Sequence, residues 1–336
     1  MATKILEICD NLENSIGGIA EYCHNLRRLF EGSSEVCISI LTIKDIKHIY
    51  FMKRINKKYI SILELYRYIR QNKFDVIHIN GFASLIVIES FLVSILLGKR
   101  ILYSPHYHPI EELSKPKLFE WIFRIFMRPL IHRADVVVTI NNEDTSFFKR
   151  FSKRVVRVPH WNYNCPEFHN NIRVIPRLLF VGRWEEAKGV EYVEMASTLC
   201  SSITCIVPYK VKRLNKSITF KSNLSRHELD EEYERSGIII IPSKYEAFSF
   251  VALEALQMEK IVLMSNKVRI LDYLDGLPNV IIFEYGNPED FLLKLKNILR
   301  VREVQVDPEH YSKTMEQFTP LRAYTSYLNI FRSIAS

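Results

Sequence analysis

Residues 238–254, IIIIPSKYEAFSFVALE, constrain the fold more than any other stretch of this chain. Four consecutive isoleucines are typical of a parallel strand that is buried on both faces, and residues 249–258 have the apolar spacing of a helix. Glu246 therefore lies where a strand turns into a helix, and Glu254 follows with seven residues between the two glutamates. Open α/β sheets bind their ligands in the crevice at such junctions.

The chemistry of this junction has two interpretations. A helix that begins near Ser249 presents unpaired N–H groups and a positive dipole end, which suit a phosphate or pyrophosphate. Glu246 and Glu254 would then accept hydrogen bonds from hydroxyl groups of the same ligand. Alternatively, Ser249 is an ordinary helix cap, and both acids are favoured near a helix start by the dipole. The spacing alone leaves both interpretations open.

Strand and helix patterns alternate along the whole chain. A length of 336 residues with 48% hydrophobic content exceeds one ordinary core, which favours two domains. The expected strands are 4–9, 36–41, 76–79, 100–103, 136–140 and 155–158, then 177–181, 203–207, 217–220, 238–241, 261–264 and 280–283. This pattern predicts an α/β fold in which a doubly wound parallel sheet occurs twice. Residues 159–176 carry three prolines and four asparagines, which predicts an interdomain linker.

Composition narrows the class of protein. Met1 leads directly into a strand, so no signal peptide is expected, and the apolar stretch 85–97 is short enough to predict a buried helix. The six cysteines show no CxxC spacing, which favours reduced core residues of a cytoplasmic protein. His106 and His108 flank Tyr107, but no further ligands of suitable spacing follow, so no metal site is predicted.

The formal net charge of +8 predicts an anionic partner. Two N-terminal stretches, 44–58 and 115–133, mix basic residues with large apolar ones, a composition that favours peripheral contact with an anionic membrane surface. Ordinary surface helices whose aromatic stripe faces the core are the alternative. No recognisable module supports nucleic-acid binding.

Two further loops suit phosphate. In LLFVGRWEEAKGVEYVEMA, residues 178–196, a strand ends in a glycine turn and is followed by Arg183 and then by Lys188 at the start of a helix. In SIGGIA, Gly17 and Gly18 precede a helix and would let the backbone approach a ligand closely. Taken alone, the first loop is equally consistent with a solvated face and the second with a simple tight turn.

Taken together, these motifs resemble one family, the retaining nucleotide-sugar-dependent glycosyltransferases of family 4 (glycosyl transferases group 1). The resemblance extends over nearly the whole chain. It rests on the Gly17-Gly18 loop, FDVIHIN, SPHYHP, ADVVVTINNED, VGRWEEAKG, LSRHELDEEY and PSKYEAFSFVALEAL. The last of these matches the family's pair of glutamates separated by seven residues, and it is the most specific element.

The resemblance implies roles for the C-terminal half. Arg183 and Lys188 would hold the donor diphosphate and stabilise the leaving group. Glu246 would bind hydroxyls of the donor sugar, and Glu254 would bind the ribose diol. Backbone amides would cap the phosphates at Phe248, Ser249 and Phe250. No metal and no other cofactor would be needed, because two cations and a helix end supply the positive charge.

For the rest of the chain, the resemblance implies a GT-B fold of two facing Rossmann-like domains. Residues 1–160 would form the acceptor domain, 161–318 the donor domain, and 319–336 a helix that returns to the first domain. His106 would hydrogen-bond the donor sugar, and Gly17 and Gly18 would approach donor phosphate and acceptor.

The implied activity is the transfer of a sugar from a nucleotide-sugar donor to a glycan or lipid-linked acceptor, in polysaccharide biosynthesis at the cytoplasmic membrane face. Ala247 and Ser249 replace the glycines that the family usually has after the first glutamate, and VPYK at 207–210 replaces a common VGxG strand end. These departures keep two alternatives open, a noncatalytic nucleotide-sugar-binding protein and a nucleotide-sugar epimerase.

Overall fold

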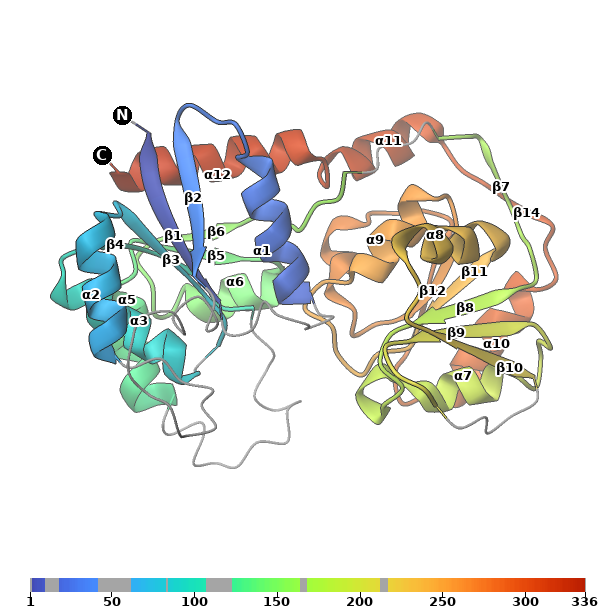
Figure 1. The fold of residues 1–336 in the computed structure, drawn as a ribbon. Coiled ribbons are helices and arrows are strands. Elements are labelled where there is room, and N and C mark those ends of the chain that lie inside the picture. Colours follow the sequence, from blue (N-terminus) through green and yellow to red (C-terminus); the bar gives the residue numbers. More distant parts are fainter. Residues whose placement is uncertain are drawn as a thin grey trace. The chain divides into compact units, whose positions relative to one another are not determined.

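The computed structural model describes residues 2–9, 18–41, 62–82, 84–106, 123–163, 168–211 and 217–335. The chain forms two compact units. Unit 1 comprises Met1–Trp161 together with Pro320–Ser336, and unit 2 comprises Asn162–Thr319. Each unit is built on its own parallel sheet with helices on both faces (Figure 1).

The sheet of unit 1 has six parallel strands in the order β2-β1-β3-β4-β5-β6. The strands are β1 (Thr3–Cys9), β2 (Val36–Leu41), β3 (Val76–Asn80), β4 (Arg100–Ser104), β5 (Val136–Thr139) and β6 (Val155–Arg157). Its helices are α1 (Gly18–Leu29), α2 (Ile62–Asn72), α3 (Leu85–Leu96), the π-helix η2 (Phe123–Met127), α5 (Arg128–His132), α6 (Asn142–Phe148) and α12 (Pro320–Ala335).

The two faces of this sheet differ in chemistry. Alternate strand residues such as Leu6, Ile77 and Tyr103 join side chains of α2, α3 and α5 in an apolar core. Toward the carboxyl ends of β1 and β3 the intervening positions are polar or sulfur-bearing, namely Glu7, Cys9, His78 and Asn80. These side chains lie on the other face because strand side chains alternate. This polar face includes the side chains that form the candidate site of unit 1.

The sheet of unit 2 has the order β10-β9-β8-β11-β12-β13, again all parallel. Its strands are β8 (Leu178–Val181), β9 (Ile203–Val207), β10 (Ile218–Ser222), β11 (Ile238–Ile241), β12 (Ile261–Ser265) and β13 (Val280–Phe283). Its helices are the 3-10 turn η3 (Glu186–Lys188), α7 (Val190–Ala196), α8 (Arg226–Arg235), α9 (Phe250–Gln257), the 3-10 turn η4 (Arg269–Tyr273), α10 (Pro288–Ile298) and α11 (Pro308–Glu316). The predicted fold class, two doubly wound parallel-sheet domains, is confirmed.

The last helix, α12, packs against α1 within unit 1 (Figure 1). The hydroxyls of Tyr22 on α1 and Tyr327 on α12 lie 2.7 Å apart and are buried. The guanidinium of Arg332 donates to Glu35 at 2.6 Å, just before β2. The C-terminal helix therefore completes unit 1, although about 160 residues of unit 2 precede it.

Two sequence-based expectations need correction. Residues 171–173 of the expected linker form strand β7 (Asn171–Arg173), which pairs antiparallel with β14 (Glu303–Gln305). Helix α3 is not buried all round, because Leu85, Leu92 and Leu96 are exposed while Phe91 and Val93 are buried. The basic stretch 44–58 and residues 115–122 of the second basic stretch lie outside the described residues. No helix formed by the described residues is both long and apolar enough to cross a bilayer.

Gly189, between η3 and α7, allows two loops of unit 2 to approach closely. Its φ is +68°, in the left-handed region, and an added Cβ would lie 1.9 Å from the carbonyl oxygen of Pro242. Only glycine tolerates both conditions. This contact brings the loop after β8 against the loop after β11.

We therefore expect Gly189→Ala to destabilise the protein more than Gly276→Ala does. Gly276 has a similar φ of +66°, but nothing lies within 4 Å of an added Cβ, so its replacement should cost only the left-handed penalty of about 1–2 kcal/mol. Urea unfolding of both variants measures the difference. Equal losses would show that the approach to Pro242 relaxes freely.

Candidate active site

The loops after β8 and β11 bring a cation and a carboxylate together in unit 2. The amide of Lys244 donates to the carbonyl of Ala187 at 3.0 Å, which ties the two loops directly. Glu246 is held by its backbone, because its N–H donates to Lys267 at 3.2 Å and its carbonyl accepts from Arg269 at 2.8 Å. In this arrangement the ammonium group of Lys188 forms an ion pair with the carboxylate of Glu246. Two residues that are 58 positions apart thus share one site.

Helix α9 begins beside this pair. Ser249 is its N-cap, and the Ser249 hydroxyl accepts from the amide of Ala252 at 3.2 Å. Phe248 is buried, and its ring contacts those of Phe250 and Phe318, both with centroids 5.9 Å away. The capping interpretation of Ser249 is therefore correct, and it is compatible with a ligand at the same helix start. The Phe248 ring is packed in the core. The phosphate contact predicted for Phe248 could therefore come only from its backbone amide.

Arg183 lies in the same loop as Lys188, but its side chain pairs elsewhere. The guanidinium contacts the carboxylate of Glu185 at 2.9 Å and is 59% exposed. Arg183 and Lys188 are therefore each neutralised by a different glutamate.

Glu254 lies on α9 and is held by two residues of α8. The guanidinium of Arg226 forms an ion pair with one carboxylate oxygen, and the Tyr233 hydroxyl donates to the other at 2.8 Å. Burial lowers the pKa of Arg226, but Glu254 and Asp230 outweigh it and the net shift is upward. Sequence reasoning missed Arg226 and Tyr233, although both lie in the LSRHELDEEY motif, seven residues apart on one helix face.

In unit 1, His106 follows strand β4 and has an unusual backbone. Its φ is +44°, a left-handed conformation that costs a residue other than glycine about 1–3 kcal/mol. Its ring nitrogen Nε2 lies 3.2 Å from Oδ1 of Asn80, at the end of β3. The amide of Asn80 in turn donates to Glu7 on β1 at 3.2 Å. Neighbouring strands thus supply a chain of three polar groups.

Aromatic rings surround His106. The Tyr22 ring packs edge to face against the His106 ring, with the two centroids 4.8 Å apart. The His160 ring stacks on the His106 ring at a centroid distance of 5.9 Å. The space at this end of the sheet, lined by His106 together with Tyr22, Ser104, Thr139, Asp144 and Tyr327, is too narrow to hold a water molecule. Burial, reinforced by His106, lowers the pKa of both His78 and His160, so both imidazoles are neutral at ordinary pH.

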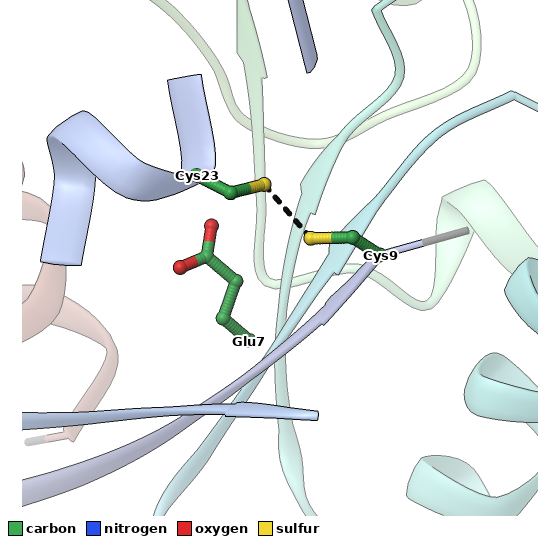
Figure 2. A group of neighbouring side chains, drawn as sticks. All are labelled: Glu7, Cys9 and Cys23. Atoms are coloured by element: carbon green, nitrogen blue, oxygen red, sulfur yellow. Dashed lines mark hydrogen bonds between the residues drawn. The ribbon is translucent and has the colours of Figure 1, made fainter. Parts of the chain in front are cut away.

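Glu7 lies near two cysteines, Cys9 and Cys23, as Figure 2 shows. Glu7, Cys9 and Cys23 are all buried, and among the described residues they form a group whose metal-ligating atoms lie within 4.8 Å of one another. The Sγ atoms are 2.8 Å apart. A tetrahedral zinc ion with bonds of about 2.3 Å would hold two sulfurs about 3.8 Å apart. The separation therefore fits a direct thiol contact better than two ligands of one zinc ion.

The predicted glycine loop is only partly described. Gly18 is the first residue of α1, and Gly17 lies outside the described residues. The remaining predicted residues fall into two groups, one in each unit. His106 lies in unit 1, and Arg183, Lys188, Glu246, Phe248, Ser249, Phe250 and Glu254 lie in unit 2.

Comparison with known proteins defines the class. Residues 16–161 match the model of Glycosyltransferase Family 4, and residues 209–315 match that of Glycosyl transferases group 1. The chain belongs to this group 1 and family 4 class of glycosyltransferases, and it has their GT-B fold.

Individual proteins resemble the chain in sequence or in structure. The chain is 24% identical over 258 residues to an uncharacterized 41.2 kDa protein in the cps region of Klebsiella pneumoniae, covering 67% of this chain and 70% of the relative. Sucrose-phosphate synthase from Thermosynechococcus elongatus is similar in structure, with a TM-score of 0.74, 14% identity and 98% coverage of both chains. HepE from Anabaena, solved with UDP and glucose, is similar in structure with a TM-score of 0.68 and 13% sequence identity. The match covers 98% of this chain and 100% of that one. At these identities the two structural likenesses show the shared fold.

The buried carboxyl of Glu7 predicts a pH-dependent stability. Burial raises the pKa of Glu7 from 4.5 to about 8, although hydrogen bonds with Cys23 and Asn80 oppose the shift. Between these values the folded protein keeps a proton that the unfolded chain releases, so Glu7's stabilising contribution is lost as pH rises toward 8. The slope from one group is at most about 1.4 kcal/mol per pH unit.

We expect Glu7→Gln, which keeps an acceptor for Asn80, to remove this slope. Urea unfolding of wild type and variant from pH 5 to pH 8.5 measures it, and the difference between the two curves isolates Glu7 from other titrating groups. Parallel curves would mean that Glu7 ionises at its usual pKa.

Proposed function

We propose that this glycosyltransferase transfers a sugar, with retention of anomeric configuration, from a nucleotide-sugar donor to a glycan or lipid-linked acceptor. The observation that carries the proposal is the pairing of Lys188 with Glu246 beside the first turn of α9. A cation and a helix N-terminus suit the donor diphosphate, and a neighbouring carboxylate suits the hydroxyls of the sugar attached to it.

In the proposed reaction, the bond between the anomeric carbon and the diphosphate oxygen breaks while the acceptor oxygen attacks from the same face. Negative charge develops on the diphosphate, and Lys188 and Arg183 stabilise it there. The leaving phosphate oxygen takes the acceptor proton, so no carboxylate nucleophile is required. We propose that no metal is needed, because preorganised cations and helix dipoles stabilise charge at low reorganisation cost.

Glu254 is proposed to bind the ribose diol of the donor. Arg226 and Tyr233 fix its carboxylate, which would orient the remaining lone pairs toward the two hydroxyls. The structure of HepE was solved with UDP, which makes a uridine diphosphate sugar the first donor to test. A noncatalytic protein would bind such a donor without turning it over. An epimerase would need a second acid or base beside Glu246.

Lys188→Ala should lower donor turnover about tenfold to a thousandfold, the scale of losing one preorganised electrostatic group. Nucleotide sugars are first screened for thermal stabilisation, since a ligand at 100 times its Kd stabilises by about 2.7 kcal/mol. Turnover of the best donor is then measured in EDTA. Lys294→Ala, which removes a lysine paired with Asp290 on α10, is the matched control and should leave turnover unchanged.

Two outcomes would contradict the proposal. Donor binding without turnover in the wild type would favour the noncatalytic alternative. Turnover that is abolished by EDTA and restored by magnesium would contradict the proposed supply of charge by Lys188, Arg183 and α9.

We also propose that the protein works at an anionic membrane surface, where it would meet a lipid-linked acceptor. Within the described residues, Leu85, Leu92 and Leu96 form an exposed apolar stripe along α3, a feature that suits a lipid interface. The basic stretch 44–58 belongs to the same unit. Each basic residue near an anionic surface contributes about 1 kcal/mol, and salt screens this attraction.

Wild-type protein should sediment with anionic vesicles at low salt and be released at high salt. A variant with Lys53, Lys57 and Lys58 changed to glutamate should stay in solution. The matched control reverses three exposed charges of unit 2 instead, at Lys296, Arg300 and Lys313, and should still sediment. If the wild type and the variant at Lys53, Lys57 and Lys58 bind equally, or if the wild type does not bind, a soluble acceptor is the better proposal.

A further inference from the structure

Two cysteines of unit 1 are brought together by elements with fixed backbones. Cys9 is the last residue of β1, where it pairs with Asn80 of β3, and Cys23 lies in the second turn of α1. Helix α1 packs against β1. The buried contact between the hydroxyls of Tyr22 and Tyr327 anchors α1 one residue before Cys23. Each thiol is therefore attached to a backbone that is held in place.

The sulfur atoms of Cys9 and Cys23 lie 2.8 Å apart and are buried, and Figure 2 shows the two side chains pointing toward each other. A disulfide bond is about 2.05 Å long, so a movement of less than about 1 Å brings the sulfurs to bonding distance. Groups that a fold holds this close react with each other as if at a very high concentration. No other pair among the described cysteines meets in this way.

We propose that Cys9 and Cys23 are a site of oxidative modification, where a disulfide forms that ties the end of β1 to α1. The co-reactant is a small disulfide of the glutathione class. One cysteine thiolate attacks it, breaks its S–S bond and forms a mixed disulfide, and the released thiolate takes up the proton that the cysteine gave up. The second cysteine attacks the mixed disulfide in the same way and releases the second thiol. Two electrons and two protons thus pass from the cysteine pair to the co-reactant.

Burial affects the rate of this reaction more than its outcome. Loss of hydration raises the pKa of the Cys23 thiol well above its usual value, so the thiolate that starts the exchange is scarce in the folded protein. The same burial keeps reductants away from the bond once it has formed. The equilibrium between the dithiol and the disulfide is therefore the quantity that tests the proposal.

The size of the expected effect follows from the loop that the bond would close. Cys9 and Cys23 are 14 positions apart. Closing a loop of about 15 residues disfavours the unfolded chain by a factor of about a hundred, provided that the native structure accepts the bond without strain. By linkage, folding should favour formation of the bond by the same factor.

The test uses the full chain with Cys37→Ser, which removes an exposed thiol. The protein is equilibrated in mixtures of oxidised and reduced glutathione, once from the folded reduced protein and once by refolding from urea in the same mixture. Thiols are trapped by acid and alkylation, and peptide mass spectrometry measures the fraction of Cys9 that is joined to Cys23. The equilibrium constant should be about a hundredfold larger in the folded protein than in the chain kept in urea.

Urea unfolding gives a second readout. The oxidised protein should have an unfolding equilibrium constant about a hundredfold smaller than that of the reduced protein. In Cys23→Ser the oxidising mixtures should no longer raise the stability. Cys200→Ser, which removes another buried thiol, is the matched control and should keep both the bond and its effect on stability.

The proposal is overturned if Cys9 and Cys23 remain thiols in the refolded protein in mixtures that already join them in the unfolded chain. An oxidised protein that is less stable than the reduced one would overturn it as well, because the bond would then strain the native structure. Should Cys23→Ser fail to fold, the comparison of oxidised and reduced protein still decides the question. None of these outcomes depends on turnover of a nucleotide sugar, so the proposed function and this proposal stand or fall separately.

Discussion

The close approach of two loops at Gly189 is the constraint on which the candidate donor site depends. A parallel sheet places all its strand ends at one edge, but it does not by itself bring neighbouring loops into contact. Here the Pro242 carbonyl occupies the space that a side chain at position 189 would fill, and the amide of Lys244 donates to Ala187. The ion pair between Lys188 and Glu246 is a consequence of that backbone contact.

In unit 1 the main constraint is different, because the candidate site residues lie on a buried polar face of the sheet. Burying Glu7, His78 and His160 is unfavourable unless they are neutral or hydrogen-bonded. The pKa shifts of all three favour their neutral forms, and Glu7 and His78 also have partners in Asn80 and Ser104. The strain at His106 thus rests on a network in which the buried charge has been removed.

Much of this architecture is predictable from sequence. Every expected strand is present, because buried parallel strands are continuous apolar runs such as Ile238–Ile241. Strand β7 was missed because it is three residues long, polar at both ends and paired with a partner far away in the chain. The sequence predicted Lys188 and Glu246 as members of two loops suited to one ligand, but it did not predict the ion pair between them. No local sequence pattern predicts that Asn80 forms hydrogen bonds with both Glu7 and His106, although Asn80 ends the FDVIHIN motif.

The charge balance of unit 2 bears on how a donor would be selected. Lys188 is paired with Glu246, Arg183 with Glu185, and Arg226 with Glu254 and Asp230. A diphosphate entering this site must compete with carboxylates that already occupy the cations, so phosphate groups alone gain little. A donor sugar can compensate, because its hydroxyls would donate to the Glu246 carboxylate as Lys188 turns toward the phosphate. Under the proposed function, this exchange makes binding depend on sugar and diphosphate together, which favours the intact donor over phosphate-bearing metabolites that lack the sugar.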